Sequence, residues 1–414
     1  MSFLPKTDDN TFYRLMNNSW MNWRGLLYSF AKQFKRNVEE KGESSTGPKC
    51  FVVDDSDLEK TGKTFEFIGR IFNHITKNHV LGFKLLLLGY WEGKSMIPID
   101  FSLHREKGKS GTYGISKKQA NNRFNKTRNS KSNGAKRVKE LDMKKTNNSI
   151  SMIKRAIKNG FIADYVLMDS WFVNDTIIQG IRSIKNCCLH VLGMCRLDRR
   201  KYTFDGKELN AKELIARYER KRSRYSRKHK SKYIPLVVDY KGHRVRLFLV
   251  KYNHSKNWTL LLTTDVRLSF VQVLELYQIR WTIEVLFREC KQYLSLGQCQ
   301  NTDFDGQIAD TTLVMITHVI LTLNKRFEDY ETMGALFRDI QQDLLELTLY
   351  ERIIQIMAKV VIALAEMFGI DINEGMERMV KNENIPDQLI KVVMELNKTW
   401  DNCPENANSD KSAA

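Results

Sequence analysis

Apolar residues run almost without interruption through three stretches in the first quarter of the chain. They are 50–56 (CFVVDDS), 80–91 (VLGFKLLLLGYW) and 95–103 (SMIPIDFSL). Runs that are apolar at consecutive positions are typical of strands buried on both faces. Two further strands are predicted at 165–169 and 189–197, with helices around 137–159 and 171–184. The pattern therefore predicts the α/β class, with a mixed sheet covered by helices.

The pattern changes at 198–265, where a basic tract precedes three short β-like runs. We expect a β-rich insertion inside a larger α/β domain. The predicted divisions are a helical segment at 1–49, the first part of the core at 50–197, the insertion at 198–265, the second part of the core at 266–308, a helical region at 309–399 and a disordered tail at 400–414. The most apolar stretch, 353–370, contains Lys359 and Glu366, which favours a buried helix over a membrane span.

One amphipathic helix, 277–291 (YQIRWTIEVLFRECK), carries an acid among cations on a single stripe. At about 100° per residue, with Tyr277 at zero, the polar positions are Arg280 at roughly 300°, Lys291 at 320°, Glu284 at 340° and Arg288 at 20°. The apolar positions Ile279, Ile283, Leu286 and Cys290 fall between roughly 180° and 240°. We expect the helix to be entered through Ser269 as an N-cap. The polar stripe is either a solvated face with weak i,i+4 pairs or one wall of a site.

The distribution of Lys and Arg along the chain indicates which class of molecule it binds. The formal net charge is +19, and the stretch 105–145 holds fourteen Lys or Arg against three acids, whereas 217–232 holds nine against one. Clustered cations favour nucleic acid, because neutralising phosphates releases counterions. A membrane surface is the rival partner, although the tracts interleave with Asn, Ser and Gly rather than with an apolar face. We expect 105–145 to be a mobile basic arm.

The seven cysteines include no C-x-x-C spacing, which argues against a structural zinc site or a disulfide framework. The first residues have no apolar signal-peptide region. A cytoplasmic protein is therefore expected.

Two aspartates stand at or near the ends of predicted strands, where burial alone would not select an acid. They are Asp54 in FVVDDSDLEK and Asp169 in YVLMDSWF. Either can be a turn former or strand cap. With Glu284 they would complete a set of three carboxylates that can hold two divalent cations for phosphodiester chemistry. Asp55 and Asp57 flank Asp54 as rivals, and strand alternation turns Asp55 to the opposite face.

A family resemblance rests on these residues. Y-x2-R-x3-E-x6-K, filled by Tyr277, Arg280, Glu284 and Lys291, resembles the signature of bacterial DDE transposases of the insertion-sequence-four type. DDSDL at 54–58 and MDSWF at 168–172 resemble the two aspartate blocks of that family. A β-rich insertion between the second aspartate and the glutamate is also typical of it.

The resemblance implies a ribonuclease H-like core that cuts DNA at transposon ends and joins the ends to target DNA. Two Mg²⁺ ions, or Mn²⁺ as substitute, would be held by Asp54, Asp169 and Glu284. Tyr277, Arg280 and Lys291 would contact phosphates of the terminal inverted repeats. The expected assembly is a dimer on DNA, associated with the bacterial nucleoid. Trp258 would stack on an unpaired base, unless it is a core tryptophan of a β-hairpin.

Two other functions stay open at this point. The stretch before Asp54 is short for the family, so the chain could be a truncated or degenerate copy that only binds DNA. A ribonuclease H-like nuclease without strand transfer is the other alternative. Trp171 and Phe172, which follow Asp169, are expected to pack in the core beneath the site.

Overall fold

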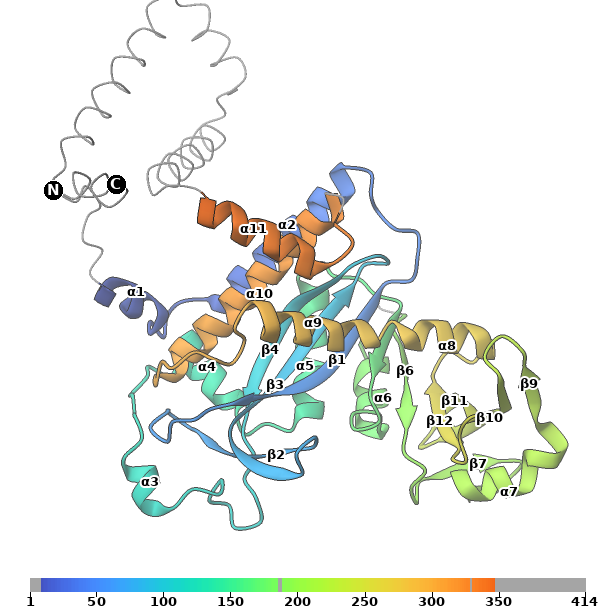
Figure 1. Cartoon of the computed structure of the whole chain (residues 1–414). Helices are drawn as coiled ribbons and strands as arrows, with labels where there is room; N and C mark the ends of the chain where they lie inside the picture. Colours follow the sequence, from blue (N-terminus) through green and yellow to red (C-terminus); the bar gives the residue numbers. More distant parts are fainter. Residues whose placement is uncertain (1–8, 185–187, 328–329, 347–414) are drawn as a thin grey trace, which may run out of the picture. The chain divides into compact units, whose positions relative to one another are not determined.

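The structure is a computed structural model that describes residues 9–184, 188–327 and 330–346 (Figure 1). The chain divides into two units, Met1–Phe337 and Arg338–Ala414. The sheet and the helices that cover it belong to the first unit. The predicted buried helix at 353–370 and the predicted tail at 400–414 lie outside the described residues.

Twelve strands of the described chain form one mixed sheet, in agreement with the predicted fold class and with a ribonuclease H-like core. The strands are β1 (Cys50–Glu59), β2 (Gly69–Asn73), β3 (Asn78–Trp91), β4 (Met96–His104), β5 (Tyr165–Met168), β6 (His190–Cys195), β7 (Lys201–Phe204), β8 (Lys207–Asn210), β9 (Arg224–Ser226), β10 (Ser231–Tyr240), β11 (His243–Tyr252) and β12 (Thr259–Thr263). Their order is β2-β3-β1-β5-β6-β12-β11-β10-β7-β8, with β4 beside β3 and β9 beside β10.

The centre of this sheet is formed by the apolar runs of the sequence. β1 pairs antiparallel with β3 and parallel with β5, and β5 pairs parallel with β6. β2, which the apolar pattern did not predict, pairs with the first residues of β3, and β4 pairs with its remaining residues. The segment between the strands predicted at 50–56 and 80–91 therefore contains β2, which forms a hairpin with β3.

Alternation along β1 divides the core between the two faces of the sheet. Phe51 and Val53 belong to one hydrophobic cluster, and Cys50 and Val52 to the other. Successive strand residues point to opposite faces, so Asp54 lies on the same face as Val52. That face is the one on which the site is built.

The insertion continues the core sheet. β12 pairs antiparallel with β6, so that Leu262 lies opposite Gly193. β11 and β10 then extend the sheet outward. The insertion therefore shares hydrogen-bonded strands with the core, and it also carries the helix α7 (Ala211–Arg222).

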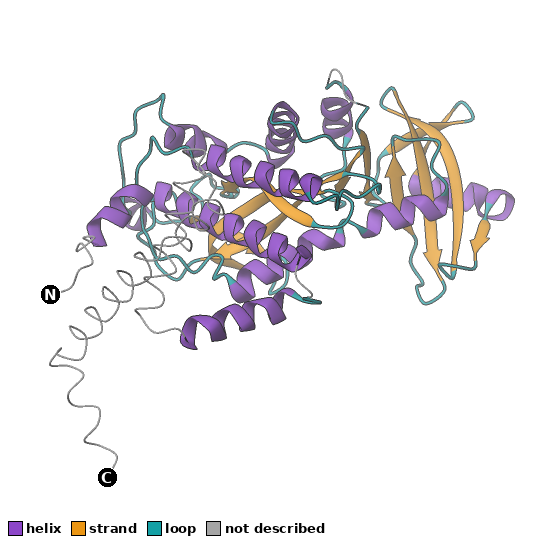
Figure 2. Ribbon diagram, turned by 90° about the horizontal axis from the view of Figure 1, so that it is seen from above, coloured by secondary structure: helices purple, strands orange, loops and turns teal. Residues whose placement is uncertain are grey.

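Helices lie on both sides of the strands (Figure 2). The remaining helices are α1 (Asp9–Met16), α2 (Trp23–Glu40), α3 (Lys117–Asn121), α4 (Asn133–Glu140), α5 (Lys145–Lys158), α6 (Asp175–Arg182), α8 (Phe270–Gln278), α9 (Trp281–Tyr293), α10 (Phe304–Phe327) and α11 (Met333–Glu346). α5 and α6 contribute to the cluster that contains Val53, whereas α8 and α9 contribute to the cluster that contains Val52. α10 is long and apolar enough to cross a membrane, but 72% of its most apolar window is buried inside the fold, as in a core helix.

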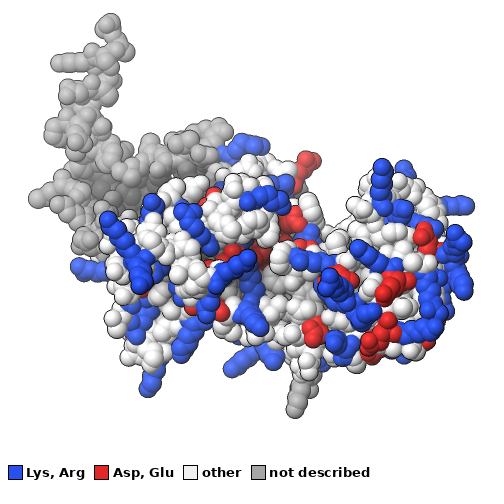
Figure 3. Space-filling view, turned by 90° about the horizontal axis from the view of Figure 1, so that it is seen from below, with Lys and Arg blue, Asp and Glu red and all other residues white. Residues whose placement is uncertain are grey.

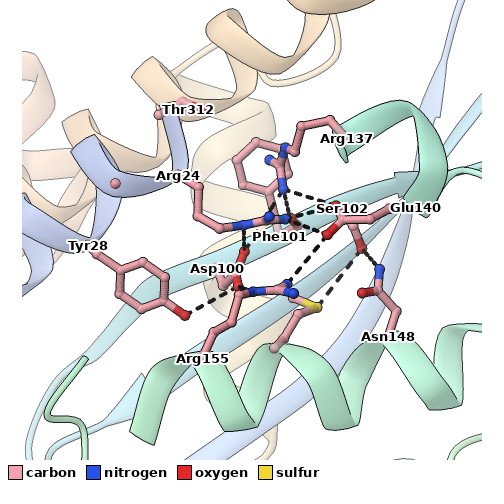
Figure 4. A network of polar contacts seen from close by, with 12 residues as sticks. Arg24, Tyr28, Asp100, Phe101, Ser102, Arg137, Glu140, Asn148, Arg155 and Thr312 are labelled. Carbon is pink, nitrogen blue, oxygen red and sulfur yellow. Dashed lines mark hydrogen bonds and ion pairs between the residues drawn. The ribbon is translucent and has the colours of Figure 1, made fainter. Parts of the chain in front are cut away.

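A buried network of charges joins α2, α4 and α5 to β4 around Asp100 (Figure 4). The carboxylate of Asp100 is 1% exposed and accepts bonds of 2.9 Å from Arg24 Nε and from Arg155 Nε. Arg24 Nη2 also donates to Glu140 at 2.8 Å. Burial alone would raise the pKa of Asp100, but Arg24, Arg155 and Arg137 together lower it. The network thus holds a charged carboxylate inside the core.

The expectation that 105–145 is a mobile arm is wrong. The stretch contains α3 and α4, and several of its Lys and Arg side chains form ion pairs with acids of the same chain. Lys126 contacts Asp303 at 2.7 Å and Asp305 at 2.9 Å. Arg128, whose side chain is only 5% exposed, contacts Glu66 at 2.5 Å. Composition alone could not reveal these ion pairs, because their acids lie far away in the sequence.

Candidate active site

The parallel pairing of β1 and β5 brings Asp54 and Asp169 together. The last registered pair of these strands is Val53 with Met168, and both aspartates follow directly. Neighbouring strands lie about 4.8 Å apart, so the two acids begin side by side. Asp54 is not at the end of its strand as predicted, because β1 continues along β3 to Glu59. Asp54 is the first residue of β1 beyond its pairing with β5. Within the described chain, the backbone of β1 therefore has no strand partner on the β5 side from Asp54 onward.

A tight turn holds the second acid. Asp169 Oδ1 accepts a bond of 2.5 Å from the Ser170 amide, and its carbonyl accepts a bond of 3.0 Å from the Phe172 amide. Asp54 Oδ1 similarly accepts from the Asp55 amide at 2.8 Å. Local backbone bonds therefore orient both carboxylates.

The predicted helix 277–291 is divided in two. Ser269 caps α8 as predicted, with its side chain accepting from the Gln272 amide. α8 ends at Gln278 and α9 begins at Trp281, with i,i+3 backbone bonds to Ile279 and Arg280 between them. Helical wheel angles assume one continuous helix, so the sequence could not place Arg280 accurately.

Arg280 bridges two of the three acids. Its Nη1 lies 3.1 Å from Asp54 Oδ2, and its Nη2 lies 2.6 Å from Glu284 Oε1. The i,i+4 pair of the helical wheel therefore exists, but Arg280 also reaches across to β1. The arrangement connects the α9 acid to the β1 acid through one guanidinium group.

Burial dominates the electrostatics of Asp54. Burial, with smaller contributions from the charges of Asp55 and Asp169, raises the pKa of Asp54 to about 7 against the effect of Arg280. Burial also raises the pKa of Tyr277 to about 12, with Asp169 adding to the shift. The charge of Asp169 thus acts on both Asp54 and Tyr277, which means that the three side chains lie near one another.

The donor set fits a divalent cation by its chemistry. Carboxylate oxygens are the ligands that Mg²⁺ prefers, and a buried carboxylate with too little neighbouring charge is stabilised by a cation. Within the described residues no group of three acids is already placed to hold one ion, and Glu284 is turned to Arg280. Asp54, Asp169 and Glu284 remain the predicted metal ligands.

The rival acids on β1 are engaged elsewhere. Asp55 forms an ion pair with Lys145 of α5, which belongs to the face opposite Asp54. Asp57 forms an ion pair with Lys84 of β3. On α9, Glu289 is half-buried and contacts His318 Nε2 at 3.0 Å.

Two predicted DNA contacts lie apart from the bridged acids. Lys291 is exposed on the wall of a cavity of about 480 Å³ that Asp57 and Glu59 also line. Trp258 is half-buried and packs against the hydrophobic cluster that contains Val53. Packing of this kind is the alternative that the sequence left open for Trp258, and its DNA contact stays a prediction.

The prediction for Trp171 is wrong. Phe172 is buried, but the Trp171 side chain is 59% exposed. Arg196 lies over its ring, with Cζ 3.8 Å from the centroid. Sequence reasoning missed Arg196, whose only signal is its position directly after β6, at the same edge of the sheet as Asp169.

Part of the chain matches a known protein family. Residues 139–320 match the family model of the transposase DDE domain. No match to a curated protein accompanies it. The matched residues contain Asp169, the insertion, Arg280 and Glu284, whereas Asp54 lies before them. A DDE transposase is therefore the class of protein that the match supports for this chain.

Proposed function

We propose that the chain is a DDE transposase of the insertion-sequence-four type that cuts DNA at transposon ends and joins the freed ends to target DNA. The observation that supports the proposal is that Arg280 joins Asp54 of β1 to Glu284 of α9, while the parallel register of β1 and β5 puts Asp169 beside Asp54. These acids come from positions far apart in the sequence, and a solvated surface helix would not require such partners.

The residues have distinct roles in this proposal. Asp54 belongs to β1, Asp169 directly follows β5, and Glu284 of α9 shares the Arg280 guanidinium with Asp54. When bound, two divalent ions would activate a water and stabilise the leaving 3′ oxygen. Water adds to the phosphorus as the bond to the 3′ oxygen breaks, and the 3′ hydroxyl later attacks a target phosphodiester in the same way.

Cations and a hydroxyl would hold the DNA. Arg280 can bind a phosphate in bidentate fashion once it leaves a carboxylate, and Lys291 acts as a point charge. Tyr277 offers a hydroxyl beside Asp169. In this proposal a dimer on the terminal inverted repeats would bring two ends together.

The test is Mg²⁺- or Mn²⁺-dependent nicking of plasmid DNA that carries the flanking ends of the chain's own gene. Glu284→Gln should lower the nicking rate by about 10³-fold or more, because it removes a metal ligand at similar size. The matched control is Glu289→Gln on the same helix, whose partner is His318. Equal activity in Glu284→Gln would overturn the proposal.

Strand transfer separates this function from its alternatives. A transposase should convert precut ends into joined plasmid products in the same assay. Nicking without joined products would instead identify a nuclease, and DNA binding without nicking would identify a repressor.

A further inference from the structure

A cavity of about 160 Å³ is lined by residues at the start of both α2 and α4. Trp23 and Arg24 come from α2, and Lys136 and Arg137 come from α4. The start of a helix carries partial positive charge, because its first amide groups have no partner within the helix. Two such helix ends at one cavity favour an anion, although they do not make a site by themselves.

Two buried side chains on the cavity wall hold N–H groups that have no hydrogen-bond partner within the described residues. They are Trp23, which is 6% exposed, through its Nε1, and Arg137, which is 5% exposed, through its Nε and Nη2. The remaining nitrogen of Arg137, Nη1, donates to the Phe101 carbonyl at 2.5 Å and to Glu140 at 3.3 Å. A buried donor without an acceptor destabilises the fold, so these groups indicate a ligand with acceptor atoms.

The cavity borders the buried network around Asp100, which has an excess of positive charge (Figure 4). In the described part of the chain, three arginines of this network, Arg24, Arg137 and Arg155, pair with two acids, Asp100 and Glu140. Burial and the charge of Arg24 lower the pKa of Arg137 to about 10, against the effects of the two acids. Water can satisfy free N–H groups, but it brings no negative charge. The ligand that fits is therefore an anion.

The one acid on the cavity wall, Asp305, has cations of its own. Its Oδ2 contacts Lys126 Nζ at 2.9 Å and Arg128 Nε at 3.0 Å. Lys136 is exposed where the cavity opens to solvent, and its Nζ contacts the neutral Asn133 side chain at 3.3 Å. Within the described residues Lys136 forms no ion pair. The fold therefore leaves positive charge on the cavity wall for a ligand.

We propose that this cavity binds a single phosphate group, which is either inorganic phosphate or a phosphate of the DNA backbone. The Nε and Nη2 of Arg137 lie on one edge of the guanidinium group, and such an edge binds phosphate through two parallel N–H bonds. Trp23 Nε1 donates a third bond, and Lys136 adds charge from the surface. The volume suits one such group, since about 150 Å³ admits a molecule the size of benzene. The inference is independent of the proposed function, because no candidate metal ligand lines the cavity.

Nitrogen-15 NMR of the indole N–H groups in the full chain tests the site directly, in EDTA so that no DNA is cut. The chain has seven tryptophans, and the signal that is missing from Trp23→Phe belongs to Trp23. Inorganic phosphate, added at constant ionic strength, should shift this signal because the N–H gains an acceptor. Trp23→Phe should also weaken phosphate binding by about tenfold in calorimetry, the effect of losing one hydrogen bond to a charged group.

A second variant leaves the buried side chains intact. Lys136→Met changes an exposed residue and should weaken phosphate binding by about threefold, the effect of one exposed charge. The matched control is Lys139→Met, on the same helix, which is also exposed but does not line the cavity. It should leave the affinity unchanged. An unmoved Trp23 signal in phosphate and in DNA, or equal affinities of the two lysine variants, would overturn the inference.

A short DNA duplex in phosphate-free buffer distinguishes the two sources of the phosphate group. A shift of the Trp23 signal with the duplex identifies a backbone phosphate. A shift with inorganic phosphate alone identifies the free ion, and either result supports the site. Failure of the proposed function is separate, because it appears as absent metal-dependent nicking whatever happens to the Trp23 signal.

Discussion

Arg280 neutralises part of the site in the arrangement that the structure describes. Its two terminal nitrogens are occupied by Asp54 and Glu284, at 3.1 and 2.6 Å. A group in this position cannot bind a DNA phosphate in bidentate fashion without releasing a carboxylate. The same movement would free both acids for a metal ion. Arg280 therefore has two competing sets of partners, carboxylates and phosphates.

This competition makes a prediction for metal binding in the absence of DNA. Arg280→Gln should bind Mn²⁺ more tightly than the wild type, by about tenfold or more, because a competing cation is removed from between two acids. Mn²⁺ affinity is measured by electron paramagnetic resonance of the free ion. DNA nicking should fall in the same variant, since a phosphate contact is lost. Weaker Mn²⁺ binding in Arg280→Gln would show that Arg280 positions the acids instead.

A single site residue can be predicted from sequence where a charged side chain follows a run of apolar, buried positions. Asp54 and Asp169 are recognisable as candidate site residues because acids rarely follow buried apolar runs, and the register of β1 and β5 puts them side by side. Trp171 was not recognised because an aromatic beside a buried Phe172 fits a core pattern equally well. The exposed side of a turn is set by tertiary contacts, which a local pattern does not contain.

Whether a segment forms a strand or where a helix ends also depends on contacts with residues far away in the sequence. The apolar runs predicted β1, β3 and β4, since consecutive burial leaves a clear pattern. β2 was missed because its partner strand, not its own composition, makes it a strand. The break between α8 and α9 has no Pro or Gly to announce it, although it determines where Arg280 points.

The docking of α2, α4 and α5 on β4 depends on Asp100. Asp100→Asn should lower the free energy of unfolding by about 3–5 kcal/mol, because it removes the buried negative charge that Arg24, Arg155 and Arg137 share and leaves them Glu140 as their one nearby acid in the network. Urea denaturation followed by circular dichroism measures the change. Lys94→Met is the control: it removes an exposed ion pair with Glu43, with side chains 58% and 43% exposed, and should have no measurable effect. Equal stabilities of the two variants would contradict a structural role for the network.

For the first unit as a whole, the sheet that holds the site also holds a strongly basic insertion. Lys and Arg side chains are spread over the face of the molecule in Figure 3. The insertion carries exposed cations that form no ion pair within the described residues, among them Arg224 and Arg227. β6 and β12 connect this surface to the strand beside Asp169. DNA bound along the insertion would therefore be held in a fixed relation to the acids.

The salt dependence of DNA binding tests this relation. The double variant Arg224→Gln, Arg227→Gln should reduce the slope of log affinity against log salt concentration by up to about 1.8, because each lost phosphate contact removes about 0.9. Lys154→Gln, Lys158→Gln on α5 has the same change in net charge and should leave the slope nearly unchanged. Fluorescence anisotropy of a labelled duplex across a salt series gives both slopes. Equal reductions in the two variants would mean that net charge alone, and not a DNA path along the insertion, controls binding.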